Sequence, residues 1–217
     1  MTNLIQVLRR GPRRRTSVVV GVFLTTVVAL GACASDPNSI AAQAQAGDRK
    51  GYLSGDGSVE QIPVNRRGEA LKLSGTTLEG AAWALTSVPA NRVVVVNVWG
   101  SWCGPCVAEA PDLQKAWSTF QTKGTAVQFI GLDFKEGADS GRAFQRRYGI
   151  TYPSLTFDGG TPVQALQGQA PAVPTTLVLD GSRRIAARVL GKTDAPTLAA
   201  LVADVLRESP STPTGHS

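Results

Sequence analysis

Two cysteines separated by two residues carry the clearest chemical signal in this chain of 217 residues. Cys103 and Cys106 enclose Gly104 and Pro105, directly after a β-branched run and at the start of a segment with helical periodicity. A helix N-terminus offers partial positive charge and free N–H groups, which favour a thiolate. We therefore expect Cys103 to be an exposed nucleophile with a lowered pKa. Cys106, one turn further along, is expected to be the resolving thiol that releases the partner.

Three other uses of these cysteines compete with a redox-active pair. A structural disulfide suits an oxidising compartment, but so short a loop removes little chain entropy. A zinc site would need two further ligands, and the remaining candidates are Cys33 and His216, so no metal is expected. A peroxidase-type cysteine would want Thr or Ser three residues earlier, where Gly100 stands, with Ser101 next to it. The redox-active pair is favoured, and thiol–disulfide exchange requires no cofactor.

The hydrophobic pattern around the pair predicts an α/β fold, with a central mixed β-sheet flanked by helices. A short hairpin is expected at residues 71–78, around Ser74-Gly75, and Asp180-Gly181 is a turn between two late strands. The strands are expected at residues 93–99, 126–132, 152–157, 175–179 and 184–190, and the helices at 104–123, 142–148 and 195–207.

The first 33 residues are typical of an export signal. Basic residues end at Arg15, and an uncharged apolar run then extends from Ser17 to Leu30. This run is shorter than the roughly 20 residues of a transmembrane helix, although a short uncleaved anchor stays an alternative. The string Leu30-Gly31-Ala32-Cys33 resembles a bacterial lipobox, which implies a lipidated Cys33. Either interpretation places the domain at the extracytoplasmic face of the cell membrane.

The expected organisation is a lipoprotein-type signal peptide at residues 1–32, a flexible tether at 33–60, a folded domain at 61–208 and a disordered tail at 209–217. The formal net charge is +6, but five arginines precede residue 16. The rest of the chain holds 17 basic and 16 acidic residues and is nearly neutral. The charge therefore gives no support for nucleic-acid binding.

The segment from Asn97 to Cys106 resembles the active-site segment of the thioredoxin superfamily, including Trp102 before the first cysteine. In that superfamily a cis-proline lies against the dithiol. By resemblance this is Pro174, and Val173 before it offers backbone groups to an extended substrate; a trans-proline at a strand start is the alternative. The resemblance thus implies these substrate-binding residues: Trp102, Gly104, Pro105, Val173 and Pro174.

Two further features are similar to the membrane-tethered ResA/TlpA/DsbE branch. Glu109 and Pro111 follow the second cysteine in the pattern Cys-x-x-Glu-x-Pro, and residues 133–158 supply an additional helix and strand. The resemblance implies that Glu109 exchanges protons with the dithiol, which burial would favour by raising its pKa. A solvated helix carboxylate is the alternative.

The branch resemblance implies a thiol-disulfide oxidoreductase, a monomer that reduces protein disulfides. Its electrons would come from a membrane thiol-reductant transporter, and its substrate would be the haem-attachment cysteines of apocytochrome c. A second hypothesis is an oxidase or isomerase of disulfides in exported proteins. A third, from another class, is a tethered binding or chaperone module in which the dithiol is incidental.

Overall fold

The computed structural model describes residues 58–208. The expected signal peptide, Cys33, most of the tether and the tail at 209–217 lie outside the described residues. Within residues 58–208, no helix has the length and apolar character that crossing a bilayer requires.

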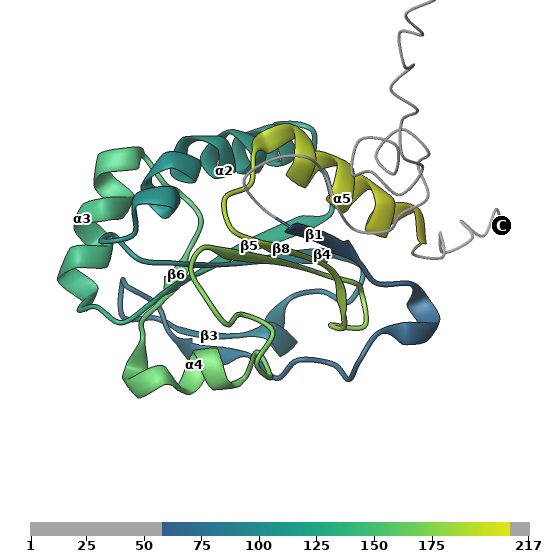
Figure 1. Ribbon diagram of the computed structural model, residues 1–217, viewed down its shortest axis with the longest axis horizontal. Coiled ribbons are helices and arrows are strands. Elements are labelled where there is room, and N and C mark those ends of the chain that lie inside the picture. Colours follow the sequence, from purple (N-terminus) through teal and green to yellow (C-terminus); the bar gives the residue numbers. More distant parts are fainter. Residues whose placement is uncertain (1–57, 209–217) are drawn as a thin grey trace, which may run out of the picture. The chain divides into compact units, whose positions relative to one another are not determined.

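A six-stranded mixed sheet forms the centre of the domain and confirms the predicted fold class (Figure 1). Strands β4, β5 and β6 run parallel, whereas β7, β8 and β1 add in antiparallel fashion at the other edge of β4. In spatial order the strands are β1 (Ser58–Gln61), β8 (Ile185–Leu190), β7 (Thr175–Leu179), β4 (Val93–Trp99), β5 (Val127–Asp133) and β6 (Ser154–Leu155).

Strand β4 lies between β5 and β7, and all seven of its residues are buried. Its run of valines satisfies this position, because a strand covered on both faces has no solvent side on which to place polar groups. Val93 and Val95 face one apolar core, while Val94 and Val96 face the other. Asn97 is the one polar residue of the strand, and it points to the first of these sides.

Helices cover one face of the sheet and a small hairpin with a short helix covers the other (Figure 1). The first layer contains α2 (Gly104–Thr122), α3 (Ala138–Tyr148) and α5 (Ala195–Glu208). The second contains the hairpin of β2 (Ser74–Thr76) and β3 (Ala82–Ala84), together with α4 (Thr161–Gln164). Three 3-10 turns complete the described elements: η1 (Val64–Arg66), η2 (Leu85–Ser87) and η3 (Asp158–Gly160).

The predicted hairpin at residues 71–78 is wrong. Leu71 and Leu73 are buried in the segment before β2. The Leu71 N–H donates to the Arg183 carbonyl, the Leu73 carbonyl accepts the N–H of Leu85 just after β3, and the real hairpin turns at Gly80. Gly80 has a φ of +85°, which a glycine adopts without strain. The apolar residues at 71 and 73 alternate because they are buried in the second layer. A local pattern of this kind does not distinguish a buried loop from a paired strand.

The additional helix and strand at residues 133–158 are present as α3 and β6, which confirms the predicted insert. Helix α3 begins at Ala138, earlier than expected, because its first turn is polar and carries no apolar periodicity. Strand β6 is confined to Ser154 and Leu155.

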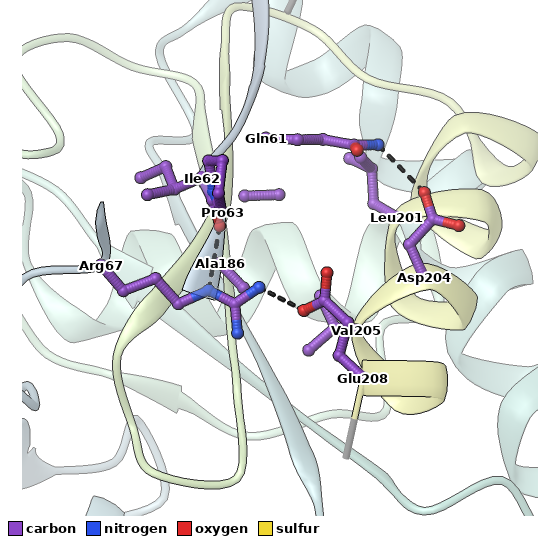
Figure 2. A pocket seen from close by; sticks show the side chains of 10 residues that line it. Gln61, Ile62, Pro63, Arg67, Ala186, Leu201, Asp204, Val205 and Glu208 are labelled. Carbon is purple, nitrogen blue, oxygen red and sulfur yellow. Dashed lines mark hydrogen bonds and ion pairs between the residues drawn. The ribbon is translucent and has the colours of Figure 1, made fainter. Parts of the chain in front are cut away.

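The expected tether boundary at residue 60 differs from the structure, because Ser58 to Gln61 pair with β8 as strand β1. Side-chain bonds fasten this entry segment to α5: Gln61 Nε2 donates to Asp204 Oδ2 (3.0 Å), and Arg67 bonds to Glu208. Figure 2 shows these bonds around a cavity of about 60 Å³. The cavity is far smaller than the ~300 Å³ and above of small-molecule sites, so it does not suggest a substrate pocket.

Gly131 offers a test of the packing between β5 and the side chains of the neighbouring strands β4 and β6. A Cβ atom at this position would overlap the Ser154 hydroxyl and lie 2.7 Å from Trp99 Nε1. We expect Gly131→Ala to lower the free energy of unfolding by about 1–3 kcal/mol, because such overpacking forces neighbouring groups to move. Urea denaturation measures this change. Gly68→Ala is the matched control, since no atom lies within 4 Å of the Cβ that it would introduce, and an equal loss in both variants would contradict the prediction.

Candidate active site

The two cysteines form a disulfide at the N-terminus of α2, with their Cα atoms 5.2 Å apart. Cys103 is the N-cap residue in extended conformation, and its Sγ accepts the N–H of Cys106 at 3.2 Å. Pro105 lies in the first helical turn, where its missing N–H leaves no intrahelical bond unmade. The helix therefore directs a donor and its partial positive charge at the Cys103 sulfur, which favours a thiolate there once the disulfide is reduced.

The nucleophile is less accessible than the sequence suggested. Cys103 is 5% exposed and Cys106 is 1% exposed, so both are buried in the disulfide form. They belong to an apolar cluster with Leu78, Trp99 and Phe144. The expectation of an exposed Cys103 is wrong for this state, but Cys103 is still the more accessible sulfur of the pair, and an incoming thiolate reaches it first.

The remaining sequence-predicted residues surround the pair. Trp102 is 58% exposed, while its Nε1 donates to the Phe134 carbonyl at 3.1 Å. Gly104 is exposed, as is Pro105 beside it. The Val173–Pro174 peptide bond is cis, and Val173 packs against the cluster that contains both cysteines. An aromatic side chain and the segment with the cis peptide bond therefore lie close to the disulfide.

Glu109 is completely buried, one helical turn after Cys106, and is therefore not a solvated carboxylate. Asn97 Nδ2 of β4 donates to its Oε1 at 2.9 Å, and the backbone N–H of Thr193 donates to its Oε2 at 3.0 Å. Burial raises the pKa of Glu109 to about 7, against the lowering effect of these two bonds and of Lys192. Such a group can both release and accept a proton near neutral pH.

The site thus combines a dithiol at a helix N-terminus with a cis-proline and a buried acid on one α/β scaffold. The AhpC/TSA family profile matches residues 67–188, which is more than half of the chain. The chain belongs to the AhpC/TSA family. Its thioredoxin-like fold and its disulfide are those of a thiol-disulfide oxidoreductase, and its curated relatives carry that activity in their names.

Among AhpC/TSA relatives, the thiol-disulfide oxidoreductase ResA of Bacillus thuringiensis is 29% identical over 124 residues, 57% of this chain and 69% of ResA. The thiol:disulfide interchange protein HelX of Rhodobacter capsulatus is 33% identical over 101 residues, which cover 46% of this chain and 53% of HelX. This chain thus spans about half the length of HelX.

Two solved structures resemble the AhpC/TSA domain described here. A secreted thiol-disulfide isomerase from Corynebacterium glutamicum has a TM-score of 0.60 and 26% identity, over 69% of this chain and 92% of that protein. A DsbF homologue from Corynebacterium diphtheriae has a TM-score of 0.59 and 27% identity, over 70% of this chain and 96% of the other.

The sequence did not reveal the partners of Glu109. The sequence does mark Asn97 as a residue that needs a hydrogen-bond partner, because it is the one amide within a buried run of valines. No sequence feature marks Thr193, since it binds Glu109 through a backbone N–H in the loop after β8. Asp133, the last residue of β5, and Glu136, in the loop after it, were also missed; Asp133 pairs with Trp99, and Glu136 bonds to Ser101.

Glu109 gives the site a pH dependence that a substitution can remove. We expect Glu109→Gln to slow disulfide exchange at pH 7 by at least about tenfold, because the amide cannot carry a proton to or from the thiols. The rate of the wild-type protein should vary with pH near 7, and that of the variant should not show this step. Stopped-flow measurement of exchange from pH 5 to 9 tests both statements.

The stability of the same variant provides a second measurement. Because the folded-state pKa of Glu109 lies above its ordinary value of 4.5, the folded chain binds this proton more tightly. Its contribution to the free energy of unfolding is present below pH 4.5 and is lost as the pH rises through about 7. Glu109→Gln should lack this loss. Glu69→Gln, at an exposed carboxylate, is the control. If Glu109→Gln lost as much free energy of unfolding as the wild type when the pH rises through 7, the raised pKa of Glu109 would be contradicted.

Proposed function

We propose that this oxidoreductase reduces disulfides of proteins outside the cytoplasm, with the haem-attachment cysteines of apocytochrome c as the first candidate substrate. The observation that carries the proposal is the buried Glu109, held by Asn97 and Thr193 one turn beyond the dithiol. A proton-exchanging group beside the dithiol is what repeated cycles between thiol and disulfide require. The likeness to ResA and HelX supports the same direction.

In the proposed reaction the reduced Cys103 thiolate attacks one sulfur of a substrate disulfide. A mixed disulfide forms and one substrate thiolate leaves. Cys106 then loses its proton to Glu109, and its thiolate attacks Cys103 Sγ. This step restores the Cys103–Cys106 disulfide and releases the second substrate sulfur as a thiolate. One substrate thiolate takes the proton held by Glu109, which returns to a carboxylate, and the other takes a proton from water. The substrate gains two electrons and two protons, and the enzyme is oxidised.

Substrate binding is assigned to the surface around Cys103. Trp102 presents an exposed ring, and Gly104 and Pro105 leave the approach to the sulfur free of long side chains. Val173 and Pro174 provide the backbone edge along which an extended peptide can lie. Together they favour a flexible polypeptide segment over a bulky folded partner.

Anchoring and electron supply complete the proposal. Residues 1–32 would direct export, a lipidated Cys33 or an uncleaved signal would hold the protein at the membrane, and residues up to 57 would act as the tether. A membrane thiol-reductant transporter would return two electrons to the disulfide after each cycle, and the protein would act as a monomer.

A second candidate function is the oxidation or isomerisation of disulfides in exported proteins. It is favoured by the likeness to the secreted thiol-disulfide isomerase of Corynebacterium glutamicum and to the DsbF homologue of Corynebacterium diphtheriae. The same two cysteines would then accept electrons from folding substrates, so the two candidates differ in redox potential and in the direction of electron flow.

The reduction potential, measured in defined thiol buffers, separates these candidates. Each ~30 mV changes the equilibrium of a two-electron couple tenfold. A value near or below that of thioredoxin, about −270 mV, supports the reductase. A value near about −120 mV, as in DsbA, supports the oxidase. The reductase should also reduce an oxidised Cys-x-x-Cys-His peptide, and failure to do so would exclude the apocytochrome c assignment.

A further inference from the structure

The loop between β5 and α3 lies against the active-site turn and holds it by several hydrogen bonds. The backbone N–H of Ser101 donates to Glu136 Oε1 at 2.5 Å, and the Ser101 hydroxyl donates to Glu136 Oε2. Beside them, Trp102 Nε1 donates to the Phe134 carbonyl at 3.1 Å. The Phe134 N–H in turn donates to the carbonyl of Trp99, the last residue of β4, at 2.7 Å.

We propose that Glu136 is a positioning residue for thiol–disulfide exchange, whose carboxylate fixes Ser101 and thereby the Trp102 and Cys103 that follow it. Both oxygens of the carboxylate bind the same residue, so the contact restricts rotation as well as distance. The proposal rests on exchange at the Cys103–Cys106 disulfide, but Glu136 takes no part in the electron or proton steps.

The turn that Glu136 holds is short and tightly packed. Within it, the Cys103 N–H donates to the Gly100 carbonyl at 3.1 Å. The Trp102 ring lies across Gly100 so closely that a Cβ on Gly100 would be 2.7 Å from Trp102 Nε1. A half-exposed indole on such a turn has little apolar burial to fix it, so the Ser101–Glu136 and Trp102–Phe134 bonds determine where it lies.

A second carboxyl group, Asp133, lies beneath this contact. It is fully buried at the end of β5, and among the described residues no donor binds either of its oxygens, so its protonated form can bond only by donating to the Glu136 carboxylate. Gly141 of α3 faces it so closely that a Cβ there would overlap the carboxyl group, and Leu78 lies beside them. The neighbouring cation, Arg142, bonds instead to the Leu78 carbonyl and to Asp139.

Asp133 makes the Glu136 contact sensitive to pH. Burial raises the pKa of Asp133 to about 8, and the hydrogen bond to Glu136 and then the negative charge of Glu136 act in the same direction. At neutral pH Asp133 is therefore protonated and can donate a hydrogen bond to Glu136, which also binds Ser101. Above pH 8 the ionised Asp133 repels Glu136, which weakens its bonds to Ser101 and loosens the turn that carries Trp102.

The first test compares variants of the full chain in the reduction of insulin disulfides by dithiothreitol at pH 7. We expect Glu136→Ala to lower kcat/KM by about tenfold, with most of the activity restored in Glu136→Gln, whose amide oxygen still accepts the Ser101 N–H. Glu60→Ala, which removes a carboxylate of β1 that pairs with Arg188 of β8, should leave kcat/KM unchanged. Equal rates in Glu136→Ala and Glu60→Ala would overturn the proposal, whereas an inactive wild type would instead count against the oxidoreductase activity itself.

A double-mutant cycle separates positioning from a general loss of stability. Ser101→Ala removes the hydroxyl donor, so its effect on kcat/KM should be smaller in the Glu136→Ala background than in wild type. Fully additive effects would mean that the two residues do not act through their mutual bonds. Melting temperatures recorded for each variant identify any loss of rate that follows from unfolding.

The second test uses Trp102 as a reporter in the oxidised protein, where the cysteines do not titrate. The difference in fluorescence between wild type and Trp102→Phe isolates this indole. We expect its emission to change with a midpoint near pH 8, and the change to vanish in Asp133→Asn. It should persist in Glu109→Gln, which removes the other buried acid. A transition that survives in Asp133→Asn would contradict the role assigned to Asp133.

Discussion

Replacement of Cys103 with serine is expected to reduce the turnover of protein disulfides by at least about a thousandfold, to the rate of uncatalysed exchange. A serine hydroxyl stays protonated at neutral pH, and no stable oxygen–sulfur link replaces the mixed disulfide. The folded structure should be preserved, because serine is among the best helix N-cap residues and can accept the Cys106 N–H as Cys103 does. The insulin reduction assay and a thermal melt measure the two quantities separately.

Ser101→Cys would be a poor control for this change, because it adds a further thiol beside the Cys103–Cys106 pair. Ser118→Ala on the outer surface of α2 is a better one: its hydroxyl accepts a neighbouring Gln114 amide, and the variant should retain wild-type turnover. If Cys103→Ser kept a tenth of the activity, Cys106 would have to be the attacking thiol, and the division of roles between the two cysteines would be reversed.

The strands that build the site could be predicted because each is a buried, β-branched run bounded by turn residues. Val93–Trp99 and Thr175–Leu179 have in the structure the limits that the sequence indicated. Burial on both faces leaves a run of apolar residues, and that run is visible in sequence without knowledge of its partners. The helix after the dithiol could be predicted equally well, since its capping residues and its apolar stripe indicate the same segment.

The missed features depend on contacts between segments far apart in the chain. Glu136 reaches Ser101 across 35 residues, and Thr193 reaches Glu109 across 84. Neither bond has a local pattern, because one partner contributes a backbone N–H that nearly every residue possesses. Asp133 has a related difficulty: an acid at the end of a strand is commonly solvated, and only the closeness of Gly141 shows that it is buried.

Glu109 lies between these two cases. Its helical spacing from Cys106 indicated a shared face, and the resemblance to the ResA/TlpA/DsbE branch supplied its role. The physical reason appears only in three dimensions. Asn97 and Thr193 hold the carboxyl group in a buried position, where desolvation outweighs their hydrogen bonds and raises its pKa to about 7. Sequence thus predicted the group, and the fold provides its chemistry.

Replacement of Cys106 with serine should convert the enzyme into a trap for its own substrates. Cys103 keeps the helix N-terminus that favours its thiolate, so the first attack on a substrate disulfide still occurs. The second attack cannot occur, because the only other sulfur within reach of Cys103 in the described residues has been removed. We expect one turnover at most, steady-state activity lowered by at least about a hundredfold, and covalent complexes that dithiothreitol dissolves.

The trapped partners distinguish the proposed functions in the same experiment. Complexes of Cys106→Ser, isolated from its native cells under non-reducing conditions, should contain c-type cytochrome precursors if the protein is their reductase. A broad set of exported proteins would instead favour the oxidase or isomerase. The double variant Cys103→Ser/Cys106→Ser is the control for non-covalent association. Complexes that form equally in this double variant would show that Cys103 does not attack the substrate, since no cysteine of the pair remains to make the bond.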